Sequence, residues 1–87
     1  MEIRYSKAAV KAIEAMDRPT KARIRAGILG LTQKPPQGDI KPMQGYHDGR
    51  QRLRVGKYRI IYKFGLGHHR TIVSAAFAQS FAPSVQL

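Results

Sequence analysis

The residues best suited to chemistry lie between Arg50 and Lys63, where basic and apolar side chains alternate. This stretch holds four arginines and two lysines: Arg50, Arg52, Arg54, Lys57, Arg59 and Lys63. A guanidinium group forms bidentate hydrogen bonds with phosphate and can stabilise negative charge that develops on it. Arginine hardly gives up its proton, however, and is a poor general base. The stretch therefore predicts phosphate binding more strongly than proton transfer.

Two strands joined by a turn at Gly56-Lys57 would position these side chains, because the alternation has the period of two that is typical of strands. A two-residue turn fixes which residues lie opposite one another. The pairs expected on one face are Val55–Tyr58, Leu53–Ile60 and Gln51–Tyr62. The pairs expected on the other face are Arg54–Arg59, Arg52–Ile61 and Arg50–Lys63. Like charges directly opposite each other are destabilising by roughly 0.2–1 kcal/mol per pair, so we expect the basic face to bind a polyanion and the apolar face to build the core.

The charge distribution agrees with nucleic acid or an acidic protein as partner. The chain has 87 residues and a net charge of +11, and every acidic residue lies at or before Asp48. From Gly49 to Leu87 there are seven Lys or Arg and no Asp or Glu. Such asymmetry predicts a strong positive field, with a basic surface that only keeps the protein soluble as the alternative.

The composition predicts a single cytoplasmic domain that spans residues 1–87. The chain has no cysteine, which excludes disulfides, thiolate zinc sites and cysteine nucleophiles. No segment approaches the roughly 20 apolar residues needed to span a bilayer, and the N-terminus lacks the apolar core of a signal peptide. We therefore expect no membrane partner.

Cap and turn residues predict the elements before the hairpin. A short strand over 2–5 precedes Ser6, a good helix N-cap, and the first helix should stop near Asp17. Pro19 suits the first turn of a second helix, which ends at Pro35-Pro36.

Glycines and prolines define the next segments. Gly27 and Gly30, which disfavour a helix interior, indicate close packing of the second helix. Residues 35–49 are expected to form a loop that Ile40 and Met43 anchor in the core.

A third main strand begins at Thr71, and the apolar residues 74–78 that follow lose the strict alternation. The order of strand, two helices and three strands predicts an α+β fold, with a helix pair packed on one face of a mainly antiparallel sheet.

Histidines are further candidates for proton transfer or metal binding. His68 and His69 are adjacent, so on a strand they would point to opposite faces, and a solvated turn is the favoured interpretation. His47 could act as a general base beside the hairpin, or be an ordinary exposed loop residue.

Tyrosines could stack on nucleobases. The expected register places Tyr58 and Tyr62 on the apolar face, which favours a place in the core for both. Tyr46 lies in the loop and is the freer candidate for stacking.

Two segments, Ile40–Gly45 and Arg52–Tyr62, resemble the central signature of the RelE/ParE superfamily of bacterial toxins. The helix pair ahead of them is similar too, so the resemblance covers residues 2–64 and leaves 65–87 as a divergent C-terminal segment. It implies a RelE-like fold with an N-terminal strand and a two-helix hairpin on a sheet of three to four strands. It also implies a cognate, RelB-like antitoxin as partner, whose acidic or amphipathic segments wrap the toxin.

For activity, the resemblance implies one of two targets. The RelE branch enters the ribosomal A site and cuts mRNA there with basic side chains and a C-terminal tyrosine, without metal or another cofactor. The ParE branch poisons DNA gyrase and has no nuclease activity. We expect a ribosome-dependent mRNA interferase that leaves a 2′,3′-cyclic phosphate and a 5′-hydroxyl. The alternatives are a gyrase inhibitor and a non-catalytic basic module that binds nucleic acid.

The resemblance also assigns site residues. Arg59 matches the arginine that contacts the scissile phosphate, and Arg50 and Arg52 occupy positions where ribosome-dependent relatives often have lysines. These three are the expected catalytic residues. The expected RNA- and phosphate-binding residues are Arg54, Lys57, Lys63, Lys21 and Arg25, with a merely solvated helix face as the alternative for the last two. The family's C-terminal arginine and tyrosine have no counterpart, because Thr71–Leu87 contains no Arg, Lys or Tyr. The sequence therefore leaves an impaired enzyme or a gyrase inhibitor as open possibilities.

Overall fold

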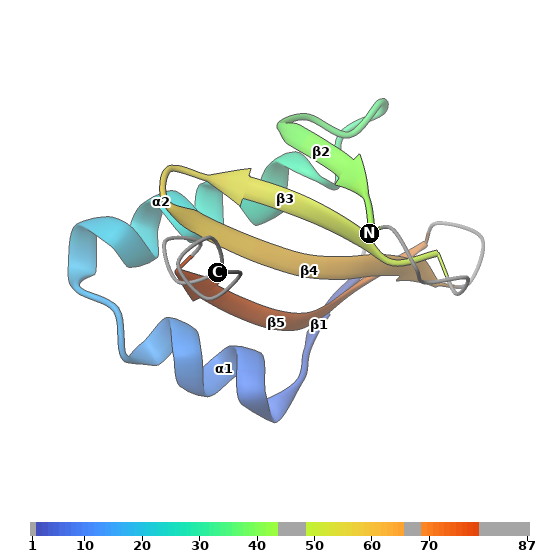
Figure 1. The fold of residues 1–87 in the computed structure, drawn as a ribbon. Helices are drawn as coiled ribbons and strands as arrows, with labels where there is room; N and C mark the ends of the chain where they lie inside the picture. Colours follow the sequence, from blue (N-terminus) through green and yellow to red (C-terminus); the bar gives the residue numbers. More distant parts are fainter. Residues whose placement is uncertain (1, 44–48, 66–68, 79–87) are drawn as a thin grey trace, which may run out of the picture.

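The computed structural model describes residues 2–43, 49–65 and 69–78, which form two helices packed on one face of a five-stranded sheet (Figure 1). The strand order is β1-β5-β4-β3-β2, with β1 parallel to β5 and the other neighbours antiparallel. The elements are β1 (Glu2–Tyr5), α1 (Lys7–Glu14), α2 (Arg18–Gly30), β2 (Asp39–Pro42), β3 (Gln51–Val55), β4 (Tyr58–Gly65) and β5 (Arg70–Ala78). This architecture confirms the predicted α+β class and its mainly antiparallel sheet.

The helices begin where the cap residues predict. The Ser6 hydroxyl oxygen accepts a hydrogen bond from the Ala9 amide at 3.0 Å and so satisfies one free donor of the first turn of α1. Asp17 is the N-cap of α2, and Pro19 lies in its first turn, where the missing amide hydrogen of proline is tolerated. Ile24 and Ile28 form the fully buried stripe of α2.

Close packing explains the two glycines of α2. A Cβ atom at Gly27 would lie 2.8 Å from Cγ2 of Val55 on β3, and one at Gly30 would lie 3.2 Å from the carbonyl oxygen of Gln37. Only glycine lets the helix approach the sheet and the following turn at these distances. The predicted close packing against the first helix or the sheet is confirmed at Gly27, whereas Gly30 packs against the loop residue Gln37.

The β3–β4 hairpin has the predicted register. Val55 pairs with Tyr58, Leu53 with Ile60, Gln51 with Tyr62, Arg54 with Arg59 and Arg52 with Ile61. Gly56 has φ of +59°, a conformation that favours glycine and that two-residue hairpin turns require. The ladder begins at the pair of Gln51 and Tyr62, so the expected pair of Arg50 and Lys63 lies outside it.

One part of the predicted loop 35–49 is a strand. Residues 39–42 form β2, which pairs antiparallel with β3 and extends the sheet to five strands, where three to four were expected. Prolines and glycines throughout residues 35–49 predict a loop, and the pairing that makes 39–42 a strand comes from residues nine to fifteen positions away in β3. Ile40 packs against the core as predicted.

A β-bulge at Ser74 accounts for the lost alternation of β5. Tyr62 pairs with Val73 and Ile61 pairs with Ala75, so Ser74 is an extra residue without a partner of its own in β4. Its hydroxyl donates a hydrogen bond to the carbonyl oxygen of Ile61 at 3.2 Å. After Val73, the next buried residue of β5 is therefore Ala76, whereas regular alternation would make it Ala75.

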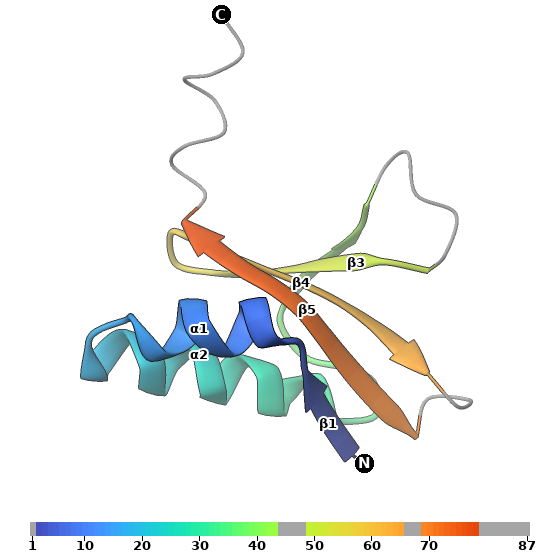
Figure 2. The same cartoon turned by 90° about the horizontal axis from the view of Figure 1, so that it is seen from below.

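Both helices lie on the same side of the sheet, and the described elements leave the other face of β3, β4 and β5 uncovered (Figure 2). The core lies between the helices and the covered face, and Tyr62 is its largest fully buried side chain. Tyr58 packs against the same cluster. The predicted place of both tyrosines on the apolar face is thus confirmed. None of the helices in the described ranges is long and apolar enough to cross a membrane.

Candidate nucleic-acid interface

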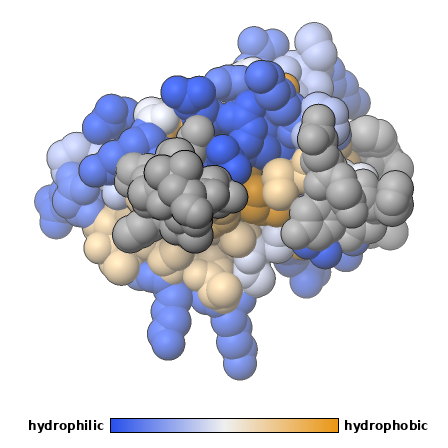
Figure 3. Space-filling model, in the orientation of Figure 1, coloured by the Kyte–Doolittle hydropathy of each residue, from blue (hydrophilic) through white to orange (hydrophobic). Residues whose placement is uncertain are grey.

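The uncovered face of the sheet, called the outer face below, carries the arginines. Because residues paired across a ladder project to the same side, the register groups them into rows. One row runs across four strands through Asp39, Arg54, Arg59 and Phe77. The next row runs through Lys41, Arg52, Ile61 and Ala75. Farther along β4, Lys63 pairs with Ile72. Figure 3 shows hydrophilic side chains gathered on the β2–β3 side of this face, with an apolar strip beside them.

Arg54 and Arg59 lie directly opposite each other at the centre of this face. Arg54 is exposed, whereas Arg59 is largely buried, and its Nε atom is enclosed without a hydrogen-bond acceptor. Neither guanidinium forms an ion pair with any acidic residue of the described ranges. Two adjacent cations and an unused buried donor both destabilise the fold, and an anion bound between the two guanidinium groups would relieve their repulsion.

Arg52 is held more tightly than its neighbours. Its Nη2 atom lies 3.4 Å from Oδ1 of Asp39, and only 11% of its side chain is exposed. Ile61, which lies next to it in the row, is 7% exposed although it sits on the outer face. Arg52 thus forms an ion pair with Asp39, and its aliphatic stem lies beside Ile61. Asp39 is directly opposite Arg54 in the ladder, but its ion pair is with Arg52.

The β1 edge of the sheet neutralises its own charges. Glu2 binds Arg4 at 2.6 Å and Arg70 at 3.0 Å, through different carboxylate oxygens. These hydrogen bonds, first from Arg4 and then from Arg70, lower the pKa of the Glu2 carboxyl. Acidic residues therefore occupy both edges of the outer face. Of its cations without an ion pair among the described residues, Lys41 lies on the edge strand β2, whereas Arg54, Arg59 and Lys63 lie toward the centre.

The structure separates the other expected site residues from this cluster. Lys21 and Arg25 lie on α2, on the opposite side of the sheet. The Lys21 amine is 3.4 Å from Oε1 of Glu14, and Arg25 lines a cavity of about 300 Å³ beside Tyr5. Arg50 immediately precedes β3, where its carbonyl oxygen accepts a hydrogen bond from the Met43 amide at 3.1 Å.

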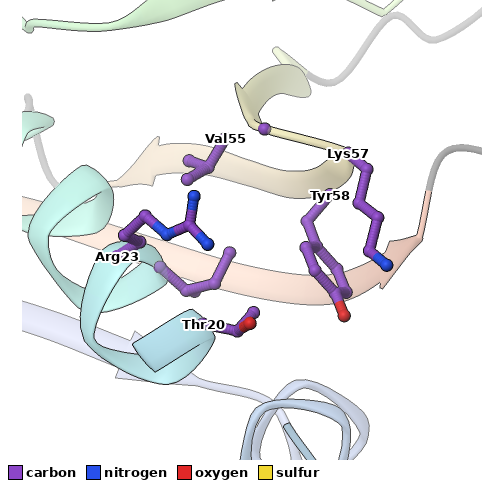
Figure 4. Close-up of a pocket in the computed structure, with 7 residues that line it drawn as sticks. Thr20, Arg23, Val55, Lys57 and Tyr58 are labelled. Carbon is purple, nitrogen blue, oxygen red and sulfur yellow. The ribbon is translucent and has the colours of Figure 1, made fainter. Parts of the chain in front are cut away.

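Lys57 lies in the β3–β4 turn, beside a cavity of about 330 Å³ between this turn and α2 (Figure 4). Figure 4 shows Arg23 reaching from α2 toward Val55, while Lys57 and Tyr58 extend side by side. The Lys57 amine is 5.8 Å from the centroid of the Tyr58 ring, within the range of a cation–π contact. This cavity lies at one end of the sheet and is separate from the Arg54–Arg59 pair.

Among the described residues, the rows around Arg59 hold one carboxylate, Asp39, and one amine, Lys41, and the carboxylate is paired with Arg52. Their described positions hold neither histidine nor tyrosine, since Tyr58 and Tyr62 face the core. The described residues also contain no cluster of acidic or histidine side chains that could hold a metal ion. Of the other candidates, His69 is exposed, whereas Tyr46, His47 and His68 lie outside the described residues.

Phe77 is the site residue that the sequence did not reveal. It pairs with Arg59 across the β4–β5 ladder and is 41% exposed. Simple alternation from Val73 would have placed residue 77 in the core, and the bulge at Ser74 reverses that assignment. The loss of alternation after Val73 was the signal that could have indicated the bulge.

Comparisons with known proteins agree with this fold. A RelB–RelE antitoxin–toxin complex from Methanococcus jannaschii is similar with a TM-score of 0.72 and 23% identity, covering 97% of this chain and 99% of that one. The archaeal RelE–RelB complex from Pyrococcus horikoshii OT3 has a TM-score of 0.73 and 18% identity, over 93% and 97% of the two chains. A YoeB/ParE toxin from Agrobacterium tumefaciens has a TM-score of 0.73 and 16% identity, over 90% and 98%. At these identities the structural likeness shows the fold alone.

Among curated proteins, none matches the sequence of this chain. The family model described as the ParE toxin of the type II toxin–antitoxin system parDE, in contrast, matches residues 3–77. This range includes both helices and all five strands except the end residues Glu2 of β1 and Ala78 of β5. The chain therefore belongs to this ParE toxin family, within the RelE/ParE superfamily of type II toxins.

Proposed function

We propose that this toxin acts on RNA, by binding mRNA on the ribosome through the outer face and promoting its cleavage. The observation that supports this proposal is the pair of Arg54 and Arg59, adjacent across the ladder and without acidic partners among the described residues. The Nη atoms of Arg59, which unlike its Nε atom are not enclosed, are the donors that phosphate oxygens would reach.

In the proposed reaction, the 2′-oxygen of a ribose attacks the adjacent phosphorus, and the bond from phosphorus to the 5′-oxygen of the next nucleotide breaks. The products are a 2′,3′-cyclic phosphate and a 5′-hydroxyl. Negative charge builds on the phosphoryl oxygens, where Arg59 stabilises it, while Arg54 and Lys63 neutralise the neighbouring phosphates. Arg52 extends the same basic surface.

Water takes the proton from the 2′-hydroxyl and supplies one to the departing 5′-oxygen, because the rows around Arg59 hold no histidine or tyrosine in the described ranges and their carboxylate, Asp39, is paired with Arg52. A positioned general acid or base contributes about 10²–10⁴-fold to a rate. The proposed enzyme is therefore slow, because its rate depends on charge stabilisation by the arginines without a positioned general acid or base.

A cognate antitoxin would block RNA binding to this surface. Its acidic segment would place carboxylates where the phosphates bind, since the centre of the outer face lacks negative charge of its own among the described residues. The similar RelB–RelE structures are themselves complexes of a toxin with an antitoxin.

The test is cleavage of a defined mRNA on programmed ribosomes with an empty A site, with primer extension to map the new ends. Wild-type protein should cut within the A-site codon. Arg59→Met keeps the aliphatic stem but removes the charge, and it should lower the rate at least about a hundredfold. Lys11→Ala, which removes a charge from the exposed surface of α1, is the control and should cut like wild type. Unchanged cleavage by Arg59→Met would refute the assigned role.

The second candidate is inhibition of DNA gyrase. The family description, which names ParE, and the lack of a histidine or tyrosine in the described rows around Arg59 favour it. In that case the ribosome assay should show no cleavage, and the purified protein should inhibit supercoiling of relaxed plasmid by gyrase. Arrested cells would then show DNA damage and intact mRNA.

A further inference from the structure

Phe77 is a large apolar side chain that is exposed within a basic row. It lies on β5 directly opposite Arg59, which in turn lies opposite Arg54. Isolated exposed apolar residues are common and need no explanation. The unusual feature here is the neighbour, a guanidinium whose buried Nε atom has no acceptor.

We propose that Phe77 is a stacking platform for one base of a single-stranded RNA whose adjacent phosphate binds Arg59 and Arg54. This proposal rests on the RNA-directed function above and adds to it how the RNA binds, with one base stacked on Phe77 and its phosphate at the arginines. Phe77 provides the aromatic face, and the two arginines provide the charge that attracts the backbone.

The geometry of the ladder supports this pairing of groups. Directly opposite residues in an antiparallel pair have Cβ atoms roughly 4.5–5.5 Å apart, so the ring of Phe77 and the stem of Arg59 start side by side. A base and its phosphate are joined through a single ribose, and they can therefore occupy neighbouring sites of this kind. Sheets that bind single-stranded RNA combine the same two elements, a stacking aromatic ring and a cationic backbone contact.

The bulge at Ser74 is what places Phe77 on this face. If β5 alternated regularly from Val73 instead of forming the bulge, Phe77 would project toward the helices and Ala76 toward the arginines. The outer face would then have no aromatic side chain in the two rows that contain Arg59 and Ile61. The ligand class follows from charge: the cations without ion pairs at the centre of this face fit a phosphate backbone better than an uncharged partner.

A single tryptophan tests the contact directly, because the chain has none of its own. In Phe77→Trp, binding of a short uridine oligonucleotide should quench the fluorescence in a saturable way. An abasic oligoribonucleotide of the same length carries the same phosphates and should not quench it. The matched control is Leu29→Trp, at a position that is 58% exposed on α2 in the helix layer, and its fluorescence should not respond to either probe.

Affinity measurements separate stacking from charge. Phe77→Ala should weaken binding of the uridine oligonucleotide about five- to a hundredfold, and Phe77→Tyr should restore it. The dependence of affinity on salt should stay unchanged in Phe77→Ala, because no phosphate contact is lost. In Arg59→Met, the slope of log affinity against log salt should instead fall by about 0.7.

The outcomes distinguish this proposal from the function on which it rests. Salt-dependent RNA binding with Phe77→Ala equal to wild type and no quenching in Phe77→Trp would overturn the stacking platform and leave the RNA-directed function intact. No RNA binding by wild type would overturn both. A loss of antitoxin affinity in Phe77→Ala, with RNA binding unchanged, would assign Phe77 to a protein interface and also overturn the proposal.

Discussion

The hydroxyl of Ser6 donates a hydrogen bond to the carbonyl oxygen of Ser74 at 2.7 Å, although the two residues are 68 positions apart. The same Ser6 oxygen accepts the amide of Ala9 at the start of α1, and its own amide binds the carbonyl oxygen of Val73. Ser6 thus fixes the start of the first helix to the bulge of the last strand.

Replacing Ser6 should therefore destabilise the protein by more than the loss of a helix cap. We expect Ser6→Ala to lower the free energy of unfolding by about 1–3 kcal/mol, from the lost cap and the lost bond to Ser74. Ser6→Thr keeps the hydroxyl and is the control, with a change of less than about 1 kcal/mol. Urea unfolding followed by circular dichroism measures the difference. Equal midpoints for Ser6→Ala and wild type would contradict the linkage.

Tyr62 should destabilise the protein at alkaline pH. Its side chain is 1% exposed, its hydroxyl has no hydrogen-bond partner, and burial raises the pKa of Tyr62 to about 12 from the usual value of 10. Between pH 10 and 12 the unfolded chain loses the tyrosine proton while the folded chain keeps it. The unfolded state then binds fewer protons, so stability falls as pH rises, by on the order of 2 kcal/mol in total. Unfolding curves between pH 9 and about 12 measure this loss.

The matched variant Tyr62→Phe removes the hydroxyl and keeps the ring. At neutral pH it should be as stable as wild type or about 1–2 kcal/mol more stable, because a buried hydroxyl without a partner is removed. Its stability should also lack the part of the alkaline decline that Tyr62 causes. A destabilised Tyr62→Phe, with the same decline as wild type, would show that the hydroxyl is paired in solution.

Gly27 should not tolerate the usual helix-stabilising substitution. In an ordinary helix Gly→Ala adds about 1 kcal/mol, but here the new Cβ would lie 2.8 Å from Val55. We expect Gly27→Ala to lower stability by about 1–3 kcal/mol. The double variant Gly27→Ala/Val55→Ala removes the clashing methyl groups, so a double-mutant cycle should give a favourable coupling between the two changes. Additive effects would rule out the contact.

Arg59 should lower the stability of the free protein. Arg59→Met removes a cation opposite Arg54 and a buried donor without an acceptor, and it keeps the aliphatic stem. The melting temperature should therefore rise by a few degrees, from about 1 kcal/mol of added stability, while RNA binding falls. A melting temperature below that of wild type would mean that Arg59 is satisfied within the fold. Such opposite effects on stability and binding are typical of functional residues.

Local signals in the sequence were enough to predict the hairpin and the starts of both helices, but not the end of α2, which lies at Gly30 instead of Pro35-Pro36. A glycine-containing two-residue turn and strict alternation determine every pair of the β3–β4 ladder, and Ser6, Asp17 and Pro19 act on backbone groups within one turn of themselves. These interactions need no knowledge of the rest of the chain.

Interactions between distant segments could not be read in the same way. Strand β2 exists because residues 39–42 pair with β3, and the bulge at Ser74 depends on how β5 pairs with β4. The ion pairs that engage Arg52 and Arg70 come from Asp39 and Glu2, on the two outermost strands. The sequence therefore predicted a group of arginines, but not which of them lack an ion pair within the described residues.

The two outermost strands also bear on solubility. Both β1 and β2 are only four residues long, and each carries an acid and a base, Glu2 with Arg4 and Asp39 with Lys41, while β2 ends in Pro42. Short, charged strands and a terminal proline hinder the addition of a further strand to an open sheet edge. The charges that hold Arg52 and Arg70 in place thus also protect the toxin from edge-to-edge aggregation.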